Sequence, residues 1–162
     1  MSTQKKYISI SDALVKARRY CAYRERCHYE VESKLKDLGL HYEFIPSVCV
    51  KLMEEGYLSE ERFVSAYIRG KFNQNKWGIN KIRIGLQQKH ISNKLIEIGL
   101  KELDEERYRD ELIKLLNKKR RTLASETTAV RKNKLWRYAL QKGFESSLIA
   151  KVVDEIETDN QE

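Results

Sequence analysis

The stretch LSEERF at residues 58–63 returns 45 positions later as LDEERY at residues 103–108. Both copies place an apolar residue before a helix-capping residue, followed by two acidic residues, an arginine and an aromatic ring. Ser and Asp are preferred at the N-cap of a helix, and the helix dipole favours acidic side chains in the first turn. A repeat period of about 20 to 50 residues is typical of an array of small units. The sequence therefore predicts stacked helical units.

Apolar residues at helical spacing surround the repeated stretch in every part of the chain. Examples are Leu14, Ala17 and Cys21, then Ile79, Ile82 and Leu86, then Tyr108 and Leu112. In the helix that follows Ser59, we expect an inner face made of Phe63, Ala66, Tyr67 and Gly70. Gly39, Gly56 and Gly143 are suited to the left-handed conformation that ends many helices. No strand-like alternation of useful length competes with these helical patterns.

These patterns predict an all-α fold, an elongated array of three tandem three-helix units with about nine helices. The expected divisions are an N-terminal extension at residues 1–10, unit 1 at 11–57, unit 2 at 58–102, unit 3 at 103–157 and an acidic tail at 158–162. Within unit 3, we expect Lys118–Arg121 to form a basic linker. A unit of about 45 residues buries little apolar surface by itself, so neighbouring units must stack.

Positive charge is concentrated in two long stretches of a chain whose formal net charge is +8. No acidic residue occurs from Arg62 to Ile96, and Glu126 is the single acid between Asn117 and Phe144. A short charge run is usually a solvated helix face. Solubility alone, however, is served by a surface with both signs interspersed. The segregation therefore favours docking on nucleic acid or a nucleoprotein, where phosphate contacts supply much of the affinity.

Other classes of protein find little support in the sequence. No apolar run approaches the ~20 residues that cross a bilayer, and no signal-peptide core is visible. Three cysteines without CxxC spacing indicate a reducing compartment, so we expect a cytoplasmic protein with no membrane partner. Cys21, Cys27, His28, His41 and Cys49 lack the spacing of zinc ligands. Without a phosphate-binding glycine loop or a nucleophile motif, we expect no enzymatic activity, no metal and no cofactor.

The centre of the chain carries a longer and more specific pattern. It reads GYLSEERF at residues 56–63 and, further on, GINKIRIGLQQKHI at residues 78–91. On these residues, and on a similar match at 24–39, the chain resembles the RecX family of regulators of the RecA recombinase. The resemblance extends from about Ala13 to Ile156. The chain departs from the family pattern at Cys27, Ser59, Gly85 and His90, where Ser, Asp, Glu and Gly are usual.

The resemblance implies tandem three-helix units and a non-enzymatic inhibitor of RecA in DNA repair, homologous recombination and the SOS response. Family members bind in the groove of the RecA–single-stranded-DNA filament and suppress ATP hydrolysis and strand exchange. We expect a monomer, and binding to free DNA stays open. The residues that we expect to contact the filament or its DNA are Arg18, Arg19, Arg24, Arg26, Lys71, Lys76, Trp77, Lys81, Arg83, Lys89, Lys118, Lys119, Arg120, Arg121, Arg131, Lys132, Lys134 and Arg137.

Individual residues in this set allow more than one interpretation. Lys81, Arg83 and Lys89 have no acidic residue nearby in the sequence, so we expect them to face the partner. Trp77 and Trp136 fit either contact with a partner, by base stacking in the case of Trp77, or packing between units. Outside the set, we expect the first-turn arginines Arg62 and Arg107 to bond to acids or carbonyls of a neighbouring unit.

Two other functions stay open at the level of sequence. One is a stand-alone helical DNA-binding regulator that uses one three-helix unit as a helix-turn-helix-like reader, with Asn80 and Gln87 suited to reading bases. The other is a helical adaptor for an acidic protein, which would show no dependence on nucleic acid.

Overall fold

The computed structural model describes residues 6–160, a range in which the chain forms nine α-helices, one 3-10 helix and no strand. The elements are α1 (Ile10–Tyr23), α2 (His28–Asp37), η1 (Tyr42–Phe44), α3 (Ile45–Glu54), α4 (Glu60–Asn73), α5 (Ile79–Gln88), α6 (Asn93–Leu100), α7 (Glu105–Arg121), α8 (Thr128–Lys142) and α9 (Ser146–Thr158). The outermost residues of the expected extension (1–5) and acidic tail (161–162) lie outside the described residues.

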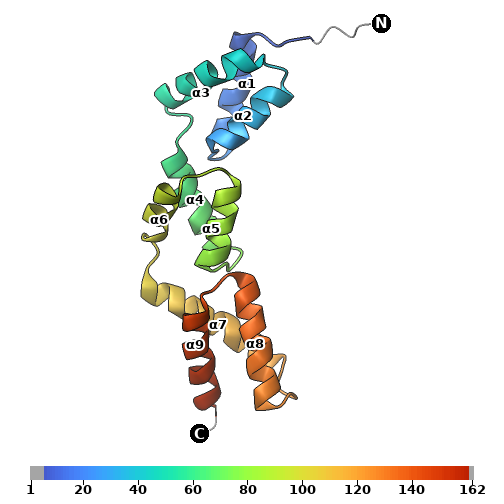
Figure 1. Cartoon of the computed structure of the whole chain (residues 1–162), viewed down its shortest axis with the longest axis vertical. Helices are drawn as coiled ribbons and strands as arrows, with labels where there is room; N and C mark the ends of the chain where they lie inside the picture. Colours follow the sequence, from blue (N-terminus) through green and yellow to red (C-terminus); the bar gives the residue numbers. More distant parts are fainter. Residues whose placement is uncertain (1–5, 161–162) are drawn as a thin grey trace, which may run out of the picture.

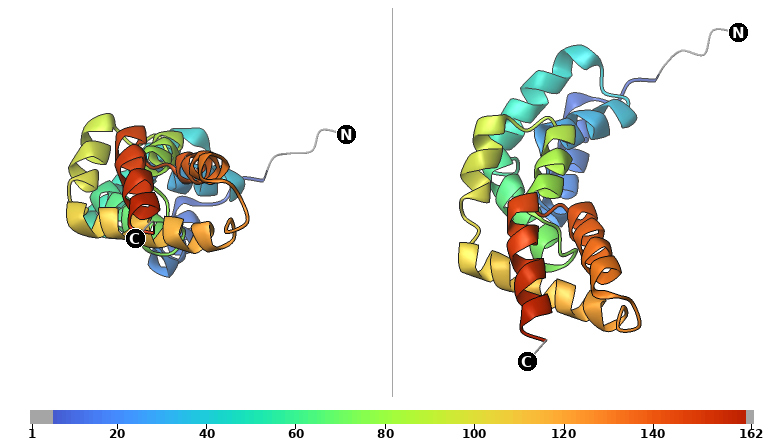
Figure 2. Two further views of the ribbon diagram at one scale, coloured as in Figure 1. Left: turned by 90° about the horizontal axis from the view of Figure 1, so that it is seen from below. Right: turned by 60° about the horizontal axis from the view of Figure 1, so that its bottom comes forward.

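The helices pack in groups of three that follow one another along the chain. The main helix–helix contacts join α1, α2 and α3 to one another, α4 to α5 and α6, α5 to α6, and α7, α8 and α9 to one another. Figure 1 shows the three groups in sequence order along the long axis, with the described ends of the chain at opposite ends of the molecule. The right view in Figure 2 shows the same succession from another direction. The predicted elongated array of three-helix units is confirmed.

The helix ends follow from short-range hydrogen bonds that the sequence predicts. The Ser59 hydroxyl accepts from the Arg62 N–H at 3.3 Å, and the Asp104 carboxylate accepts from the Arg107 N–H at 2.7 Å. These two bonds cap α4 and α7 at the repeated motif. Gly143 ends α8 with a φ of +96°, in the left-handed region that is open to glycine. His90, which stands at the corresponding turn of unit 2, also has a positive φ, of +58°.

The buried side chains form two clusters. One lies in unit 1 and includes Leu35 and Leu52, together with Leu58 at the start of unit 2. The other runs through units 2 and 3 without interruption, and it includes Phe72, Leu112 and Phe144. Cys27 of unit 1 also belongs to this second cluster. Units 2 and 3 therefore share one core, which provides the stacking that such small units require.

Two expectations about local structure are wrong. The residues Lys118–Arg121 form the last turn of α7 and not a linker; the helix dipole favours cations at that end. The buried face of α4 consists of Phe63, Val64, Ile68 and Phe72, whereas Ala66, Tyr67 and Gly70 are half-buried. The expected stripe is rotated because α4 packs against both α5 and α6, and two neighbours bury a wider face than one.

The three cysteines are free thiols in buried positions. Cys27 stands at the N-cap of α2, where its backbone N–H donates to the Glu30 carboxylate at 3.4 Å. Burial raises the pKa of the Cys27 and Cys49 thiols to about 11, so both are protonated at neutral pH.

Candidate nucleic-acid interface

Units 2 and 3 meet where the start of α5 contacts the turn after α8. We call this contact, between residues 75–81 and 141–144, the joint. The Gly78 N–H donates to the Lys142 carbonyl at 2.8 Å, and the Asn80 N–H donates to the Gly143 carbonyl at 2.9 Å. A Cβ atom added to Gly78 would lie only 2.4 Å from the Gly143 carbonyl carbon. The two backbones therefore touch, and this contact fixes the position of one unit on the other.

An aromatic ring on each side of the joint is flanked by lysines. The Nζ atoms of Lys71 and Lys81 each lie 4.7 Å from the centre of the Trp77 ring. Lys119 and Lys142 lie 5.2 and 5.9 Å from the Tyr138 ring. We call these residues, Lys71, Trp77, Lys81, Lys119, Tyr138 and Lys142, the joint cluster. Tyr138 and Lys142 were absent from the expected set. Lys142 lies in the second basic stretch, whereas Tyr138 stands at helical spacing from Leu135 and Ala139, a pattern that by itself indicates packing.

The two halves of the joint cluster are connected across the joint. The Lys142 Nζ donates to the Asn75 carbonyl at 3.3 Å, and the Lys81 Nζ donates to the Gln141 carbonyl at 3.4 Å. Both rings are half-buried and pack against the core that units 2 and 3 share. The lysines and rings are therefore held in one group by backbone atoms of both units.

The lysines of the joint cluster have no carboxylate within 4.0 Å among residues 6–160. The same holds within that range for four exposed cations of the expected set, Arg19, Lys118, Arg121 and Arg137. Lys118 and Arg121 stand in the last turn of α7 beside Lys119, and Arg137 precedes Tyr138 on α8. These side chains leave positive charge available to an external anion.

Other cations of the expected set are paired with carboxylates from elsewhere in the fold. Arg83 binds Glu97 at 2.7 Å, and Lys89 lies 3.6 Å from Glu30. No acidic residue is near these two side chains in the sequence, but the fold brings Glu97 of α6 and Glu30 of α2 beside them. That they face the partner stays a prediction. The full paired group is Arg18, Arg24, Arg26, Lys76, Arg83, Lys89, Arg120, Arg131, Lys132 and Lys134.

The carboxylate of Glu30 lies within 4.0 Å of three cations at the contact between units 1 and 2. It is only 8% exposed, and it lies 3.1 Å from Arg24, 3.6 Å from Lys89 and 3.9 Å from Arg26. Lys89 comes from unit 2, whereas both arginines come from the turn before α2. These cations therefore neutralise a buried carboxylate and join two units.

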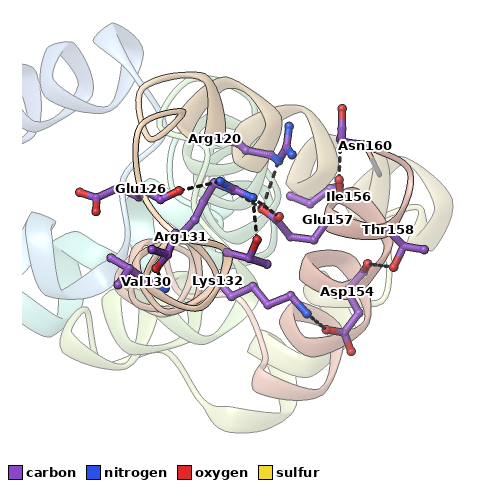
Figure 3. A network of polar contacts seen from close by, with 12 residues as sticks. Arg120, Glu126, Val130, Arg131, Lys132, Asp154, Ile156, Glu157, Thr158 and Asn160 are labelled. Carbon is purple, nitrogen blue, oxygen red and sulfur yellow. Dashed lines mark hydrogen bonds and ion pairs between the residues drawn. The ribbon is translucent and has the colours of Figure 1, made fainter. Parts of the chain in front are cut away.

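Glu157 has the same role inside unit 3 (Figure 3). This carboxylate on α9 is 2% exposed, and it binds Arg131 at 2.6 Å and Arg120 at 3.1 Å. The hydrogen bond from Arg131 and the further bond from Arg120 hold the pKa of Glu157 below its ordinary value. Arg120 and Arg131 thus stabilise the packing of α7 and α8 on α9.

Contacts between units confirm the expectation for the two first-turn arginines. Arg62 binds Glu25 of unit 1 at 3.0 Å, and Arg107 donates to the side-chain carbonyl of Asn73 in unit 2 at 2.6 Å. Trp136 is half-buried and packs on the core of units 2 and 3.

Two family models match more than half of the chain. The model of the second three-helix domain of RecX matches residues 59–100, and the model of the third matches residues 105–153. The chain belongs to the RecX family. The matched ranges lie on both sides of the joint, so the fold described for units 2 and 3 is that of two RecX domains.

Relatives and solved structures agree with this assignment. A regulatory protein RecX of Bacillus cytotoxicus is 27% identical over 147 residues, which cover 91% of this chain and 54% of the relative. That of Lactobacillus johnsonii is 28% identical over 158 residues, which cover 98% and 58%. The chain thus spans about half the length of these curated relatives. A crystal structure of RecX from Lactobacillus salivarius has a TM-score of 0.84 at 24% identity, covering 92% of this chain and 97% of that chain.

The relatives are named as regulatory proteins. None of the helices within residues 6–160 has the length and apolar character needed to span a membrane. In the same range, no three His, Cys, Asp or Glu side chains are grouped as metal ligands.

Proposed function

We propose that this RecX family member is a non-enzymatic modulator of the RecA recombinase. It binds in the groove of the RecA–single-stranded-DNA filament and suppresses ATP hydrolysis and strand exchange. The observation that carries the proposal is the group of cations without carboxylate partners within residues 6–160, both in the joint cluster and beside it on α7 and α8, because the DNA in such a filament offers phosphates as their partners. The relatives, which are named regulatory proteins, provide the class of activity.

The shape of the molecule supports the same function. The three units follow one another along a single axis, with helices α1 and α9 at opposite ends (Figure 1). An elongated array of this kind can lie along a filament groove and contact several protomers at once, as repeat proteins do with extended partners. Contact with several protomers would oppose the changes in filament geometry that accompany ATP hydrolysis.

The side chains of α5 favour this function over a stand-alone reader of duplex DNA. A recognition helix contacts bases with residues near its N-terminus. The first residue of α5, Ile79, donates its N–H to the Tyr108 hydroxyl of unit 3 at 3.0 Å, so this end is covered. Asn80 accepts a bond from Arg83 at 3.0 Å, and Gln87 donates to Asn93 at 3.5 Å. The amides suited to reading bases are bonded within their own unit.

The proposal is tested by the ATPase activity of RecA on single-stranded DNA. We expect the chain to inhibit this activity, and we expect the triple variant Lys118→Gln, Arg121→Gln, Arg137→Gln to need on the order of tenfold more protein for the same inhibition, because three phosphate contacts are removed. The matched control is Lys94→Gln, Lys101→Gln, Lys151→Gln, which removes the same charge from exposed positions on α6, the turn after it, and α9. No inhibition by the unmodified chain would refute the proposed function.

Salt provides a second and independent test. Binding to the filament should weaken steeply between about 50 and 200 mM salt, because phosphate contacts release counterions. The triple variant at Lys118, Arg121 and Arg137 should show a slope of log affinity against log salt that is smaller by about 2 to 3. Fluorescence anisotropy of labelled filaments gives both slopes. Affinity that is flat over this range would instead indicate apolar docking.

A further inference from the structure

The joint cluster combines two chemistries that a nucleotide requires, cations for its phosphate and a flat ring for its base. We propose that this cluster binds a short run of single-stranded nucleic acid directly, without the recombinase, with a base stacked on Trp77 and phosphates on Lys71 and Lys81. The inference rests on the proposed function, and it names the contact by which the array reaches the polynucleotide. Sequence-tolerant stacking on aromatic side chains in a basic groove is how many proteins hold single strands.

The Trp77 ring is held in place by backbone bonds on both sides. The Trp77 N–H donates to the Lys71 carbonyl at 3.1 Å, and the next N–H, of Gly78, donates to the Lys142 carbonyl at 2.8 Å. The backbone that carries the ring therefore cannot move unless the joint opens. The ring on its fixed backbone is already in position, so that only the flexible lysine side chains have to move when a base stacks on it.

The lysines of the joint cluster can replace their contacts with rings and carbonyls by contacts with phosphate. All four Nζ atoms lie near a ring, those of Lys81 and Lys142 also donate to carbonyls, and no carboxylate within residues 6–160 pairs with them. A hydrogen bond from an ammonium to a phosphate is charge-assisted and is stronger than a partly solvated contact with a ring. Phosphates near the Trp77 ring would draw Lys71 and Lys81 toward them and uncover the ring for a base.

The other side of the joint continues the same pattern. Tyr138 on α8 offers a second half-buried ring, with Lys119 and Lys142 beside it. Because Lys142 also donates to the carbonyl of Asn75, two residues before Trp77, the bond connects the two halves of the cluster from unit 3 to unit 2. A strand bound here would run across the joint. Bases in a duplex are already stacked and paired, so a duplex cannot offer them to these rings.

The chain contains two tryptophans, so Trp77 can serve as its own reporter. In a Trp136→Phe background, titration with oligothymidylate should change Trp77 fluorescence saturably, and duplex DNA of the same length should produce little change. Oligouridylate in a parallel titration shows whether the site accepts RNA as well as DNA. No fluorescence change on binding of either oligonucleotide would overturn the stacking.

Substitutions of Trp77 and its two lysines show whether these side chains bind the oligonucleotide directly or only pack within the protein. Lys71→Gln with Lys81→Gln should weaken oligothymidylate binding by about tenfold, more than the matched pair Lys94→Gln with Lys101→Gln, which removes equal charge far from Trp77 in the sequence. Trp77→Ala should weaken it by about 5- to 150-fold, and Trp77→Phe should retain part of the affinity because a ring remains. Circular dichroism melting verifies that each variant is folded. Equal affinities for the two lysine pairs would overturn the proposed site.

The RecA ATPase assay distinguishes the failure of this inference from the failure of the proposed function. Inhibition of RecA by a chain whose Trp77 does not respond to single strands would refute the joint cluster as the contact and leave the modulator function standing. Binding of single strands through Trp77 without any effect on RecA would refute the modulator function and leave the site standing.

Discussion

Replacing Gly78 with alanine is expected to lower the free energy of unfolding by about 3 kcal/mol. The new Cβ would lie 2.4 Å from backbone atoms of Gly143 and Phe144, which cannot move without breaking the bonds that connect units 2 and 3. The joint must therefore separate or both backbones must shift. Urea titration followed by circular dichroism measures the loss. Loss of RecA inhibition should accompany it, because the cations of the two units would no longer be held together.

Gly70→Ala is the matched control for this change. Gly70 lies inside α4, and nothing stands within 4 Å of the Cβ that alanine would add. Alanine in a helix interior is favoured over glycine by about 1 kcal/mol, so this variant should be more stable than the parent. If Gly78→Ala were as stable as Gly70→Ala, the close backbone contact at the joint would be wrong.

Glu157→Ala is expected to reduce the free energy of unfolding by about 3 kcal/mol. The carboxylate is 2% exposed and binds both Arg120 and Arg131, as Figure 3 shows. Removing one member of a buried ionic group leaves the remaining charges without a partner. The resulting loss of stability is larger than the net stabilisation that the intact group provides. Thermal and urea unfolding would measure the loss. Glu155→Ala, which removes an exposed carboxylate from the same helix, is the control and should cost clearly less.

The lowered pKa of Glu157 predicts how the free energy of unfolding depends on pH. Because the pKa of Glu157 is lower in the folded chain than its ordinary value of 4.5, its contribution is complete above that value and disappears as the pH falls through the folded pKa. The unmodified chain should lose stability on acidification below about pH 4.5. Glu157→Gln should be less stable at neutral pH and should show a shallower loss on acidification. If the free energies of unfolding of the two proteins changed in parallel with pH, the lowered pKa of Glu157 would not be the cause of the loss.

Charge patterning in the sequence predicts the class of partner, but it was a poor guide to which individual cations are paired. Two stretches with at most one acidic residue predict a basic protein that docks on a polyanion, and the cations of the joint cluster come from these two stretches. Within the same stretches, however, Arg83 and Arg131 are bound by Glu97 and Glu157. A carboxylate that is 14 or 26 residues away in the chain has no visible link to the arginine until the helices pack.

Local features were predictable because their causes lie within one helical turn. The caps at Ser59 and Asp104 each use a bond to the residue three positions later, and the repeated motif therefore predicts where α4 and α7 begin. By contrast, the buried face of α4 was misplaced because it depends on two neighbouring helices. Trp77 belongs to the same class: the sequence left open whether it packs or binds, since the lysines around it come from two helices.

The sequence by itself predicted most of the helical elements, the organisation in three units, the membership in the RecX family and the excess of positive charge, since each follows from residue types and their spacing along the chain. Only the tertiary structure decided which cations are neutralised by carboxylates of other helices and which remain available for phosphate. It also decided that Gly78 and Gly143, 65 positions apart in the chain, touch. The physical reason is that ion pairing and backbone contact act over a few ångströms in space, whatever the separation along the chain.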